Sequence, residues 1–275
     1  MSPRTHVFLT GFPRSGTTLL EQALAGRPDV EVLAEREPLI DAIRAYLDGP
    51  AGLDRLADAS EAELDGFRES YWRIARREGA KPDCQVFIDK QPFNTLKLPL
   101  IVRLFPDAKI LFARRDPRDV VLSCFRRRFL LSAPTYEFLT LQGAAALYDA
   151  AMRLAARLDE IAGMDLRVVA HEELVAGFDR ELQRVCGWLG LDWSKSMRQF
   201  PERVRENAVA TPSGAQLARG LNADGVGHWR RYRQQMSAVL PLLAPWVERF
   251  GYGDEIEGPD PHAPRPRRAE DAASA

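Results

Sequence analysis

The sequence predicts an α/β fold with a central parallel sheet that is covered by helices on both faces, which makes a three-layer domain. Short apolar segments alternate with helical patterns along the chain, as in a series of strand and helix units. The segments are apolar at consecutive positions, which is typical of strands that are buried on both sides of a parallel sheet. The expected strands lie at 7–10, 30–33, 86–88, 109–113 and 166–170.

Helices are expected between these strands. Apolar residues recur at helical spacing in 61–77, where Leu64, Phe67, Tyr71 and Ile74 fall on one face. Similar patterns predict the other helices, at 39–47, 96–105, 136–161, 178–189 and 226–250.

Three stretches are expected to lack helices and strands. A loop around Gly49 and Pro50 separates two helices, and a long ordered loop beyond Trp193 lies over the functional site. The tail from residue 254 is rich in proline, alanine and charge, and we expect it to be disordered. The chain is therefore interpreted as one domain, residues 1–253, followed by a disordered tail, residues 254–275.

The composition excludes several classes of protein. With 275 residues, 45% hydrophobic content and a formal net charge of -1, the chain can bury a full core but offers no bulk basic field for nucleic acid. Its three cysteines, Cys84, Cys124 and Cys186, are too widely spaced for a disulfide framework or a zinc site. No apolar run is long enough to span a membrane, and the first strand begins too early to leave room for a signal segment. A cytoplasmic location is expected. The sequence does not determine the oligomeric state and is compatible with a homodimer.

The loop between the first strand and the first helix is suited to an anion. It reads Gly-Phe-Pro-Arg-Ser-Gly-Thr-Thr over residues 11–18, and Gly16 allows the tight turn that points backbone N–H groups inward at the helix start. The pattern is P-loop-like, but Thr17 occupies the position of the lysine that reaches the terminal phosphates of a nucleoside triphosphate. Arg14 supplies a charged fork instead. The loop therefore predicts anion binding without ordinary ATP or GTP hydrolysis.

Other polar residues follow directly on the remaining strands. Lys90, Arg115 and His171 each come just after an apolar segment. Ligands of parallel sheets bind at the carboxyl ends of the strands, so these residues are expected at one edge together with the loop. Arg115 and Ser123, with a helix start at Pro117 between them, can converge on one terminal phosphate through charge-assisted hydrogen bonds.

Together these motifs resemble the sulfotransferases that use 3'-phosphoadenosine 5'-phosphosulfate, and within them the branch of the tyrosylprotein sulfotransferases and their bacterial relatives. The resemblance runs from Val7 to about Tyr232. It implies that the loop holds the 5'-phosphosulfate of this co-substrate, through Arg14, Ser15, Gly16, Thr17 and Thr18. It also implies that the 3'-phosphate is held by Arg115, Ser123 and Arg127.

The same resemblance implies three catalytic roles. Glu35 matches the general base that takes the proton of the acceptor hydroxyl. Lys90 and Ser213 match the groups that stabilise charge on the departing phosphate and on the sulfuryl oxygens during in-line displacement. Glu37 is close enough in sequence to compete with Glu35 for the base role. No metal is expected to be required.

Two positions depart from the family pattern. His171 begins a His-Glu-Glu-Leu segment where the family has a tyrosine, and it either stacks on the adenine or is an inert residue at the strand end. His228 precedes Trp229 where relatives carry lysine or arginine, so Arg230 is a candidate for that charge. Neither departure affects the expected chemistry.

The main hypothesis is a sulfotransferase that moves a sulfuryl group from this donor to a hydroxyl acceptor. One alternative is a P-loop kinase that acts on a small molecule, with Asp89 as a magnesium ligand. Another is a catalytically inactive module that binds a nucleotide. The segments expected to shape the acceptor pocket, 39–77 and 130–147, have ordinary amphipathic patterns. These patterns do not distinguish a peptide tyrosine from a glycan, lipid or small-molecule hydroxyl.

Overall fold

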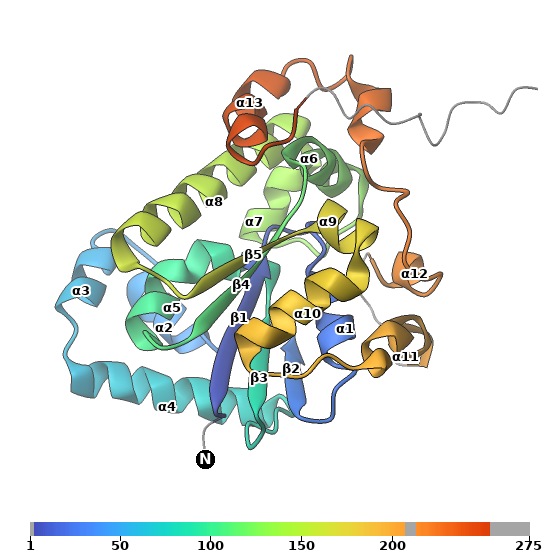
Figure 1. Ribbon diagram of the computed structural model, residues 1–275. Coiled ribbons are helices and arrows are strands. Elements are labelled where there is room, and N and C mark those ends of the chain that lie inside the picture. The colour runs from blue at the N-terminus through green and yellow to red at the C-terminus, as the bar shows by residue number, and fades with distance from the viewer. Residues whose placement is uncertain (1–2, 207–212, 254–275) are drawn as a thin grey trace, which may run out of the picture.

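The computed structural model describes residues 3–206 and 213–253, and a five-stranded parallel sheet forms its centre (Figure 1). The strands are β1 (Thr5–Gly11), β2 (Val30–Ala34), β3 (Val86–Lys90), β4 (Lys109–Arg114) and β5 (Leu166–Ala170). Each expected strand is confirmed. The tail for which disorder is expected, 254–275, lies outside the described residues.

The first strand occupies the middle of the sheet, whose order is β2-β3-β1-β4-β5. Leu9 of β1 pairs with Lys90 of β3 on one side and with Leu111 of β4 on the other. The chain therefore builds β2 and β3 on one side of β1 before it crosses to β4 and β5 on the other. The carboxyl end of β1 lies where the strand order reverses, which is the usual ligand position in such sheets.

Helices cover both faces of the sheet, as expected. Val7 and Leu9 of β1 pack in one buried cluster and Phe8 packs in the other, because successive side chains of a strand point to opposite faces. The cluster on the Val7 side includes residues of α1 (Thr17–Leu24), α9 (His171–Ala176) and α10 (Phe178–Leu189). It also includes Phe200, at the start of α11 (Phe200–Glu206). The cluster on the Phe8 side extends through α2 (Ile40–Tyr46), α3 (Gly52–Asp58), α4 (Glu61–Arg77), α5 (Leu98–Leu104), α6 (Pro117–Arg126), α8 (Leu141–Ala162) and α13 (Leu240–Arg249) (Figure 1).

The long helix expected from residue 136 begins later than the pattern indicates. It is preceded by α7 (Ala133–Tyr136) and by a short 3₁₀ helix, η2 (Glu137–Leu139). Thr140 is extended, and its hydroxyl accepts a hydrogen bond from the N–H of Gly143 at 2.9 Å. A threonine in this position is an N-cap and defines where a helix starts. The apolar pattern across this region therefore belongs to separate elements.

Two segments expected to be loops contain short helices. Helix α3 follows directly on the turn around Gly49 and Pro50. Beyond Trp193 the chain forms η3 (Lys195–Gln199), α11 and α12 (Gly214–Leu217). The expectation of one helix at 226–250 is wrong, because this stretch contains η4 (His228–Tyr232) and α13 (Leu240–Arg249) with turns between them. Helices this short are marginal in isolation and depend on tertiary contacts, such as the burial of Leu56 in α3 and Trp229 in η4. Their sequences alone do not display those contacts.

A buried polar network lies between the sheet and α4. The fully buried Asp89 carboxylate accepts hydrogen bonds from the Tyr71 hydroxyl at 2.9 Å and from the side-chain amide of Asn94, in η1 (Pro92–Lys97), at 3.3 Å. Nε2 of His6 lies 3.0 Å from the same hydroxyl. Burial outweighs the hydrogen bonds and raises the pKa of Asp89 to about 7, and burial lowers the pKa of His6 to about 3. Both groups are therefore held toward their neutral forms.

We predict that Asp89 makes the free energy of unfolding fall as the pH rises from about 4 to about 7. Its pKa is about 7 in the folded protein and about 3.9 in an unfolded chain, so the folded state holds the proton more tightly and loses that advantage as the proton leaves. Asp89→Asn removes the contribution. Denaturant unfolding across this interval should show the free energy of the variant falling less than that of the parent, by up to about 4 kcal/mol.

The control is Asp107→Asn, since Asp107 is exposed at the end of the connection that precedes β4. This variant should follow the parent at every pH. Parallel curves for the parent and Asp89→Asn would contradict the account of the buried network.

Candidate functional site

The candidate site begins at the loop between β1 and α1. Arg14 and Gly16 have φ angles of 73° and 103°, both in the left-handed region. Gly16 is the N-cap of α1, so the N–H groups of Thr17 and Thr18 lie in the first turn, where a helix provides no backbone partner. The positive end of the helix therefore faces the loop, which is an arrangement that favours an anion.

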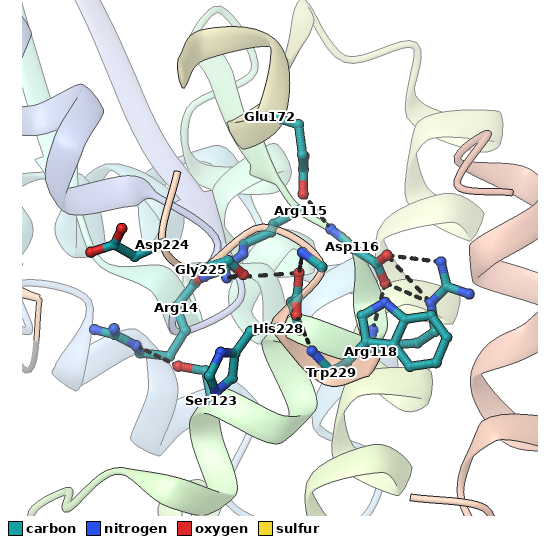
Figure 2. A network of polar contacts seen from close by, with 12 residues as sticks. Arg14, Arg115, Asp116, Arg118, Ser123, Glu172, Asp224, Gly225, His228 and Trp229 are labelled. Carbon is teal, nitrogen blue, oxygen red and sulfur yellow. Dashed lines mark hydrogen bonds and ion pairs between the residues drawn. The ribbon is translucent and has the colours of Figure 1, made fainter. Parts of the chain in front are cut away.

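Arg14 reaches from this loop to two hydroxyl groups. Its Nε donates to Oγ of Ser123 at 3.0 Å (Figure 2), and its Nη1 donates to Oγ of Ser213. Burial, together with the guanidinium groups of Arg115 and Arg127, lowers the pKa of Arg14 to about 10. Within residues 3–206 and 213–253, no carboxylate forms an ion pair with Arg14. Among the described residues, the guanidinium of Arg14 therefore donates to neutral hydroxyl groups.

Arg115 follows β4 and contacts the same loop from the other side. Its Nη1 donates to the carbonyl oxygen of Arg14 at 3.1 Å, and its Nη2 donates to the carbonyl oxygen of Gly225 (Figure 2). A carboxylate oxygen of Asp119 lies 3.9 Å from Nη2. The chain around Gly225 is thereby held against the end of β4.

Asp119, in α6, fixes the backbone of this covering segment. Its carboxylate accepts hydrogen bonds from the N–H groups of Gly227 at 2.7 Å and Trp229 at 2.8 Å. Burial raises the pKa of Asp119 to about 6, although Arg115 and the two N–H groups favour the charged form. The turn that carries Gly225 is therefore anchored to the helix that carries Ser123.

Two adjoining cavities lie between the loop, α6 and the segment 213–228. The larger is about 330 Å³, and its lining includes Arg14, Arg115, Ser123 and Arg127. The smaller is about 50 Å³, and its lining includes Arg14, Gly16, Thr18, Arg115, His171 and Ser213. Of the residues expected to hold the donor, Ser15 and Thr17 line neither cavity, and both side chains are buried. The remaining ones lie together.

His171 packs directly on the loop. A Cβ atom added to Gly16 would lie 2.9 Å from Nδ1 of His171, so the imidazole occupies the space that the glycine leaves. Burial and the nearby arginines lower the pKa of His171 to about 3, which keeps the ring neutral. The next residue, Glu172, accepts a hydrogen bond from the N–H of Asp116 at 3.1 Å (Figure 2). This segment therefore joins the end of β5 to the start of α6.

His228 lies beside Arg126 at the larger cavity. Nε2 of His228 lies 2.6 Å from Nη1 of Arg126, and both residues line the larger cavity. Arg230 lines neither cavity, and its guanidinium lies 5.8 Å from the ring centroid of Trp229. Arg126 therefore lies beside His228 at the larger cavity, and a role for Arg230 in place of the missing lysine stays a prediction.

Two of the expected catalytic residues are in direct contact. Nζ of Lys90 donates to Oε1 of Glu35 at 2.6 Å, and the N–H of Glu35 donates to the carbonyl oxygen of Lys90 at 2.7 Å. Lys90 is fully buried, whereas the Glu35 side chain is 42% exposed. Glu35 has a φ angle of 51° at the end of β2. A carboxylate that solvent reaches and a buried cation thus lie side by side at the carboxyl ends of β2 and β3.

The other two candidates have different partners. Glu37 is paired with Lys97, whose Nζ also donates to Oδ1 of Asn94 at 3.2 Å. Ser213 contacts Arg14 rather than Lys90. Thr211 and Pro212, which precede Ser213 in its motif, lie outside the described residues. Glu35 rather than Glu37 is therefore the carboxylate that lies with Lys90.

The structure argues against Asp89 as a magnesium ligand beside the loop. Its carboxylate points to the α4 face of the sheet, where Tyr71 and Asn94 occupy its oxygens, whereas α1 covers the opposite face. Within the described ranges, no group of three or more His, Cys, Asp or Glu side chains is placed to hold a metal ion. The kinase interpretation requires Asp89 as a magnesium ligand, and the structure does not support that role.

Two residues at the site are absent from the sequence prediction. Glu21 lies in α1 with its Oε2 2.8 Å from Nζ of Lys90. Asp119 anchors the covering segment, as described above. A signal for Glu21 exists in the sequence, because it is the one charged residue within 17–24. The sequence offers no comparable signal for Asp119, whose partners are backbone groups more than a hundred residues away.

Comparisons with known proteins place these features in a family context. A family model described as the sulfotransferase family matches residues 6–195. A putative protein-tyrosine sulfotransferase of Caenorhabditis briggsae is 24% identical over 264 residues, which cover 92% of this chain and 91% of that protein. Protein-tyrosine sulfotransferase 2 of Gallus gallus is 24% identical over 277 residues, which cover 94% of this chain and 72% of that protein.

Solved structures show the same fold. The sulfotransferase domain of the Synechococcus olefin synthase has a TM-score of 0.63 at 21% identity, covering 92% of this chain and 96% of that chain. Mouse sulfotransferase SULT7A1, solved in complex with PAP, has a TM-score of 0.52 at 16% identity, covering 92% of this chain and 86% of that chain. The expected P-loop-like fold is confirmed.

We predict that Gly16→Ala destabilises the protein and removes anion binding. The new Cβ would require a φ angle that alanine rarely adopts and would meet His171 at 2.9 Å, so we expect a loss of about 1–3 kcal/mol in the free energy of unfolding. Pyrophosphate serves as the anion. It should raise the thermal unfolding temperature of the parent but not that of the variant.

Gly79→Ala is the matched control. Gly79 has a similar φ angle of 97°, but a Cβ there would meet no atom within 4 Å. This variant should show the backbone strain and keep the response to pyrophosphate. A Gly16→Ala protein that responds as the parent does would mean that the loop is not the anion site.

Proposed function

The chain belongs to the sulfotransferase family, and we propose that it moves a sulfuryl group from 3'-phosphoadenosine 5'-phosphosulfate to a hydroxyl group of an acceptor. One observation carries the proposal. Glu35 and Lys90 lie 2.6 Å apart at the sheet edge that also holds the arginine-lined cavity. A base, a cation and an anion site at one edge are the groups that sulfuryl transfer to a hydroxyl needs.

The charges around the larger cavity support the identity of the donor. Its lining has an excess of cationic side chains, five arginines against two aspartates: Arg14, Arg115, Arg126, Arg127 and Arg219 against Asp119 and Asp224. One of the aspartates, Asp119, is already engaged by two backbone N–H groups. We assign the 3'-phosphate to this cavity and the 5'-phosphosulfate to the loop. The mouse neighbour was solved with PAP, the desulfated form of this donor, which is consistent with the assignment.

Arg14 and Arg115 have hydrogen bonds that a phosphate can replace. Arg14 donates to the hydroxyl of Ser213, and Arg115 donates to the carbonyl oxygen of Gly225. Both acceptors are neutral. Charge-assisted hydrogen bonds to phosphate oxygens are roughly twice as strong as those between neutral groups, so the exchange favours the bound anion.

The proposed transfer is a single in-line displacement. The acceptor oxygen forms a bond to sulfur while the bond between sulfur and the bridging oxygen breaks, and the electron pair of the broken bond stays on the phosphate. Glu35 takes the proton of the acceptor hydroxyl. Lys90 donates a hydrogen bond to the bridging oxygen as negative charge develops there, and the Ser213 hydroxyl donates to the sulfuryl oxygens.

The acceptor remains open within the class of hydroxyl compounds. The curated relatives are named for protein tyrosine, but a peptide, a glycan, a lipid and a small molecule are all compatible with a base at Glu35. Among the residues that the structure describes, no helix has the length and hydropathy to cross a membrane. A cytoplasmic location, a homodimer and independence from metal ions stay predictions.

We predict that Glu35→Gln lowers kcat by about 10²- to 10⁴-fold, because the acceptor hydroxyl loses the group that takes its proton. Binding of 3'-phosphoadenosine 5'-phosphate should stay within about threefold, since Glu35 does not line either cavity of the donor site. Turnover is measured with the labelled donor and a panel of peptide, phenol, sugar and long-chain alcohol acceptors.

Glu37→Gln separates the two carboxylates. Glu37 is held by Lys97, and its loss should leave kcat unchanged. Normal turnover of Glu35→Gln together with a large loss of kcat in Glu37→Gln would contradict the assignment of Glu35. It would show that Glu37 is the base.

A further inference from the structure

Glu21 is a buried carboxylate that the proposed reaction does not yet use. It lies in α1, behind the anion loop, and is 4% exposed. Its Oε1 accepts a hydrogen bond from the side-chain amide of Gln22 at 2.7 Å, and its Oε2 lies 2.8 Å from Nζ of Lys90. A carboxylate is rarely buried without a partner, and here the partner is the lysine of the candidate site.

Lys90 lies between two carboxylates that differ in their exposure to solvent. Glu21 and Glu35 lie 2.8 Å and 2.6 Å from its Nζ. The Glu21 side chain is 6% exposed, whereas that of Glu35 is 42% exposed. Removal of a partner from a buried ion pair leaves a charge without compensation and is strongly unfavourable. The two carboxylates are therefore not interchangeable, since only Glu35 is open to solvent and to an acceptor.

The reaction itself changes the charge of one of them. If Glu35 takes the proton of the acceptor hydroxyl, it becomes neutral while Lys90 is still needed as a cation at the bridging oxygen. A fully buried ammonium group then depends on its other anion. Glu21 is buried away from the acceptor, so its contact with Lys90 is independent of the proton that Glu35 takes.

We propose that Glu21 is a positioning residue that serves as the permanent counter-ion of Lys90 during sulfuryl transfer, and this inference rests on the proposed function. An ammonium group has three N–H donors. Glu35 accepts a hydrogen bond from one of them and the Glu21 carboxylate lies 2.8 Å from Nζ as an ion-pair partner, so a third N–H is available to the edge where β3 ends. That third N–H donates to the bridging oxygen as the electron pair of the broken bond collects there, while the acceptor proton goes to Glu35.

Glu21→Gln keeps the size of the side chain and removes its charge. We expect kcat to fall on the order of 10²-fold, because Lys90 is displaced or loses its proton. The affinity for 3'-phosphoadenosine 5'-phosphate, measured by calorimetry, should stay within about threefold. The high-pH limb of the kcat profile should move to lower pH, since the buried lysine has lost an anion that helps it to hold the proton.

A spectroscopic measurement tests the same point without donor or acceptor. The chain contains five lysines, so a sample labelled with ¹⁵N at lysine gives a simple spectrum, and the Lys90 signal is assigned by its loss in Lys90→Arg. In Glu21→Gln the Lys90 ammonium should titrate at lower pH than in the parent. A purely structural role for Glu21 predicts lower thermal stability but an unchanged titration.

Two further variants control for burial and folding. Glu181→Gln removes a carboxylate of the same low exposure, paired with Arg180 and Arg184 in α10, and should leave both the kcat profile and the Lys90 signal as in the parent. Glu21→Asp keeps the charge with a side chain one methylene shorter. It should recover part of the lost kcat and most of the Lys90 titration, and it provides the test if Glu21→Gln does not fold.

Equal kcat profiles and equal Lys90 titrations in the parent, Glu21→Gln and Glu181→Gln would overturn the proposal. The proposal would also be overturned if Glu21→Asp had the same kcat and the same Lys90 titration as Glu21→Gln. A parent that neither binds 3'-phosphoadenosine 5'-phosphate nor transfers a sulfuryl group would contradict the proposed function instead. In that case the titration of Lys90 still decides whether Glu21 is its counter-ion.

Discussion

The register of β1 with its two neighbours is the constraint on which the whole site depends. Leu9 pairs with Lys90 and Gly11 pairs with Ala113, so the chain turns into the loop where β3 and β4 also end. A lysine therefore lies on one side of the loop and an arginine, Arg115, on the other. A shift of one residue in β3 would exchange the directions of Lys90 and Asp89, because successive side chains point to opposite faces.

The cationic side chains on the two sides of the loop have different kinds of partner. On the β3 side, the cation of Lys90 is compensated by Glu21 and Glu35 within hydrogen-bonding distance. On the β4 side, Arg14 and Arg115 donate mainly to neutral oxygens, and burial next to like charge lowers the pKa of Arg14 to about 10. The first arrangement suits proton transfer, and the second suits capture of an anion.

Much of the fold, and the gathering of the loop residues at the end of β1, could be predicted because the signals are local. Consecutive apolar residues mark the five strands, and the loop around Gly16 carries its turn chemistry within eight residues. The start of α8 depends on one threonine cap, Thr140, within a continuous apolar pattern, and α3 depends on packing. The contact of Lys90 with Glu21 joins two distant segments, and the packing of α1 against the sheet brings them together. Interactions of that kind have no pattern in the sequence.

The proposed function requires that this edge of the sheet binds a nucleotide with a 3'-phosphate. Calorimetric titration of the parent with 3'-phosphoadenosine 5'-phosphate, ADP and ATP without magnesium, repeated with Arg115→Ala, tests it most directly. Arg115 lies 8% exposed at the meeting point of the two cavities, so its loss should remove the groups that distinguish the 3'-phosphate. We expect tight binding of the bisphosphate alone and the loss of that binding in the variant. Equal or tighter binding of ATP, unaffected by Arg115→Ala, would contradict the proposed function.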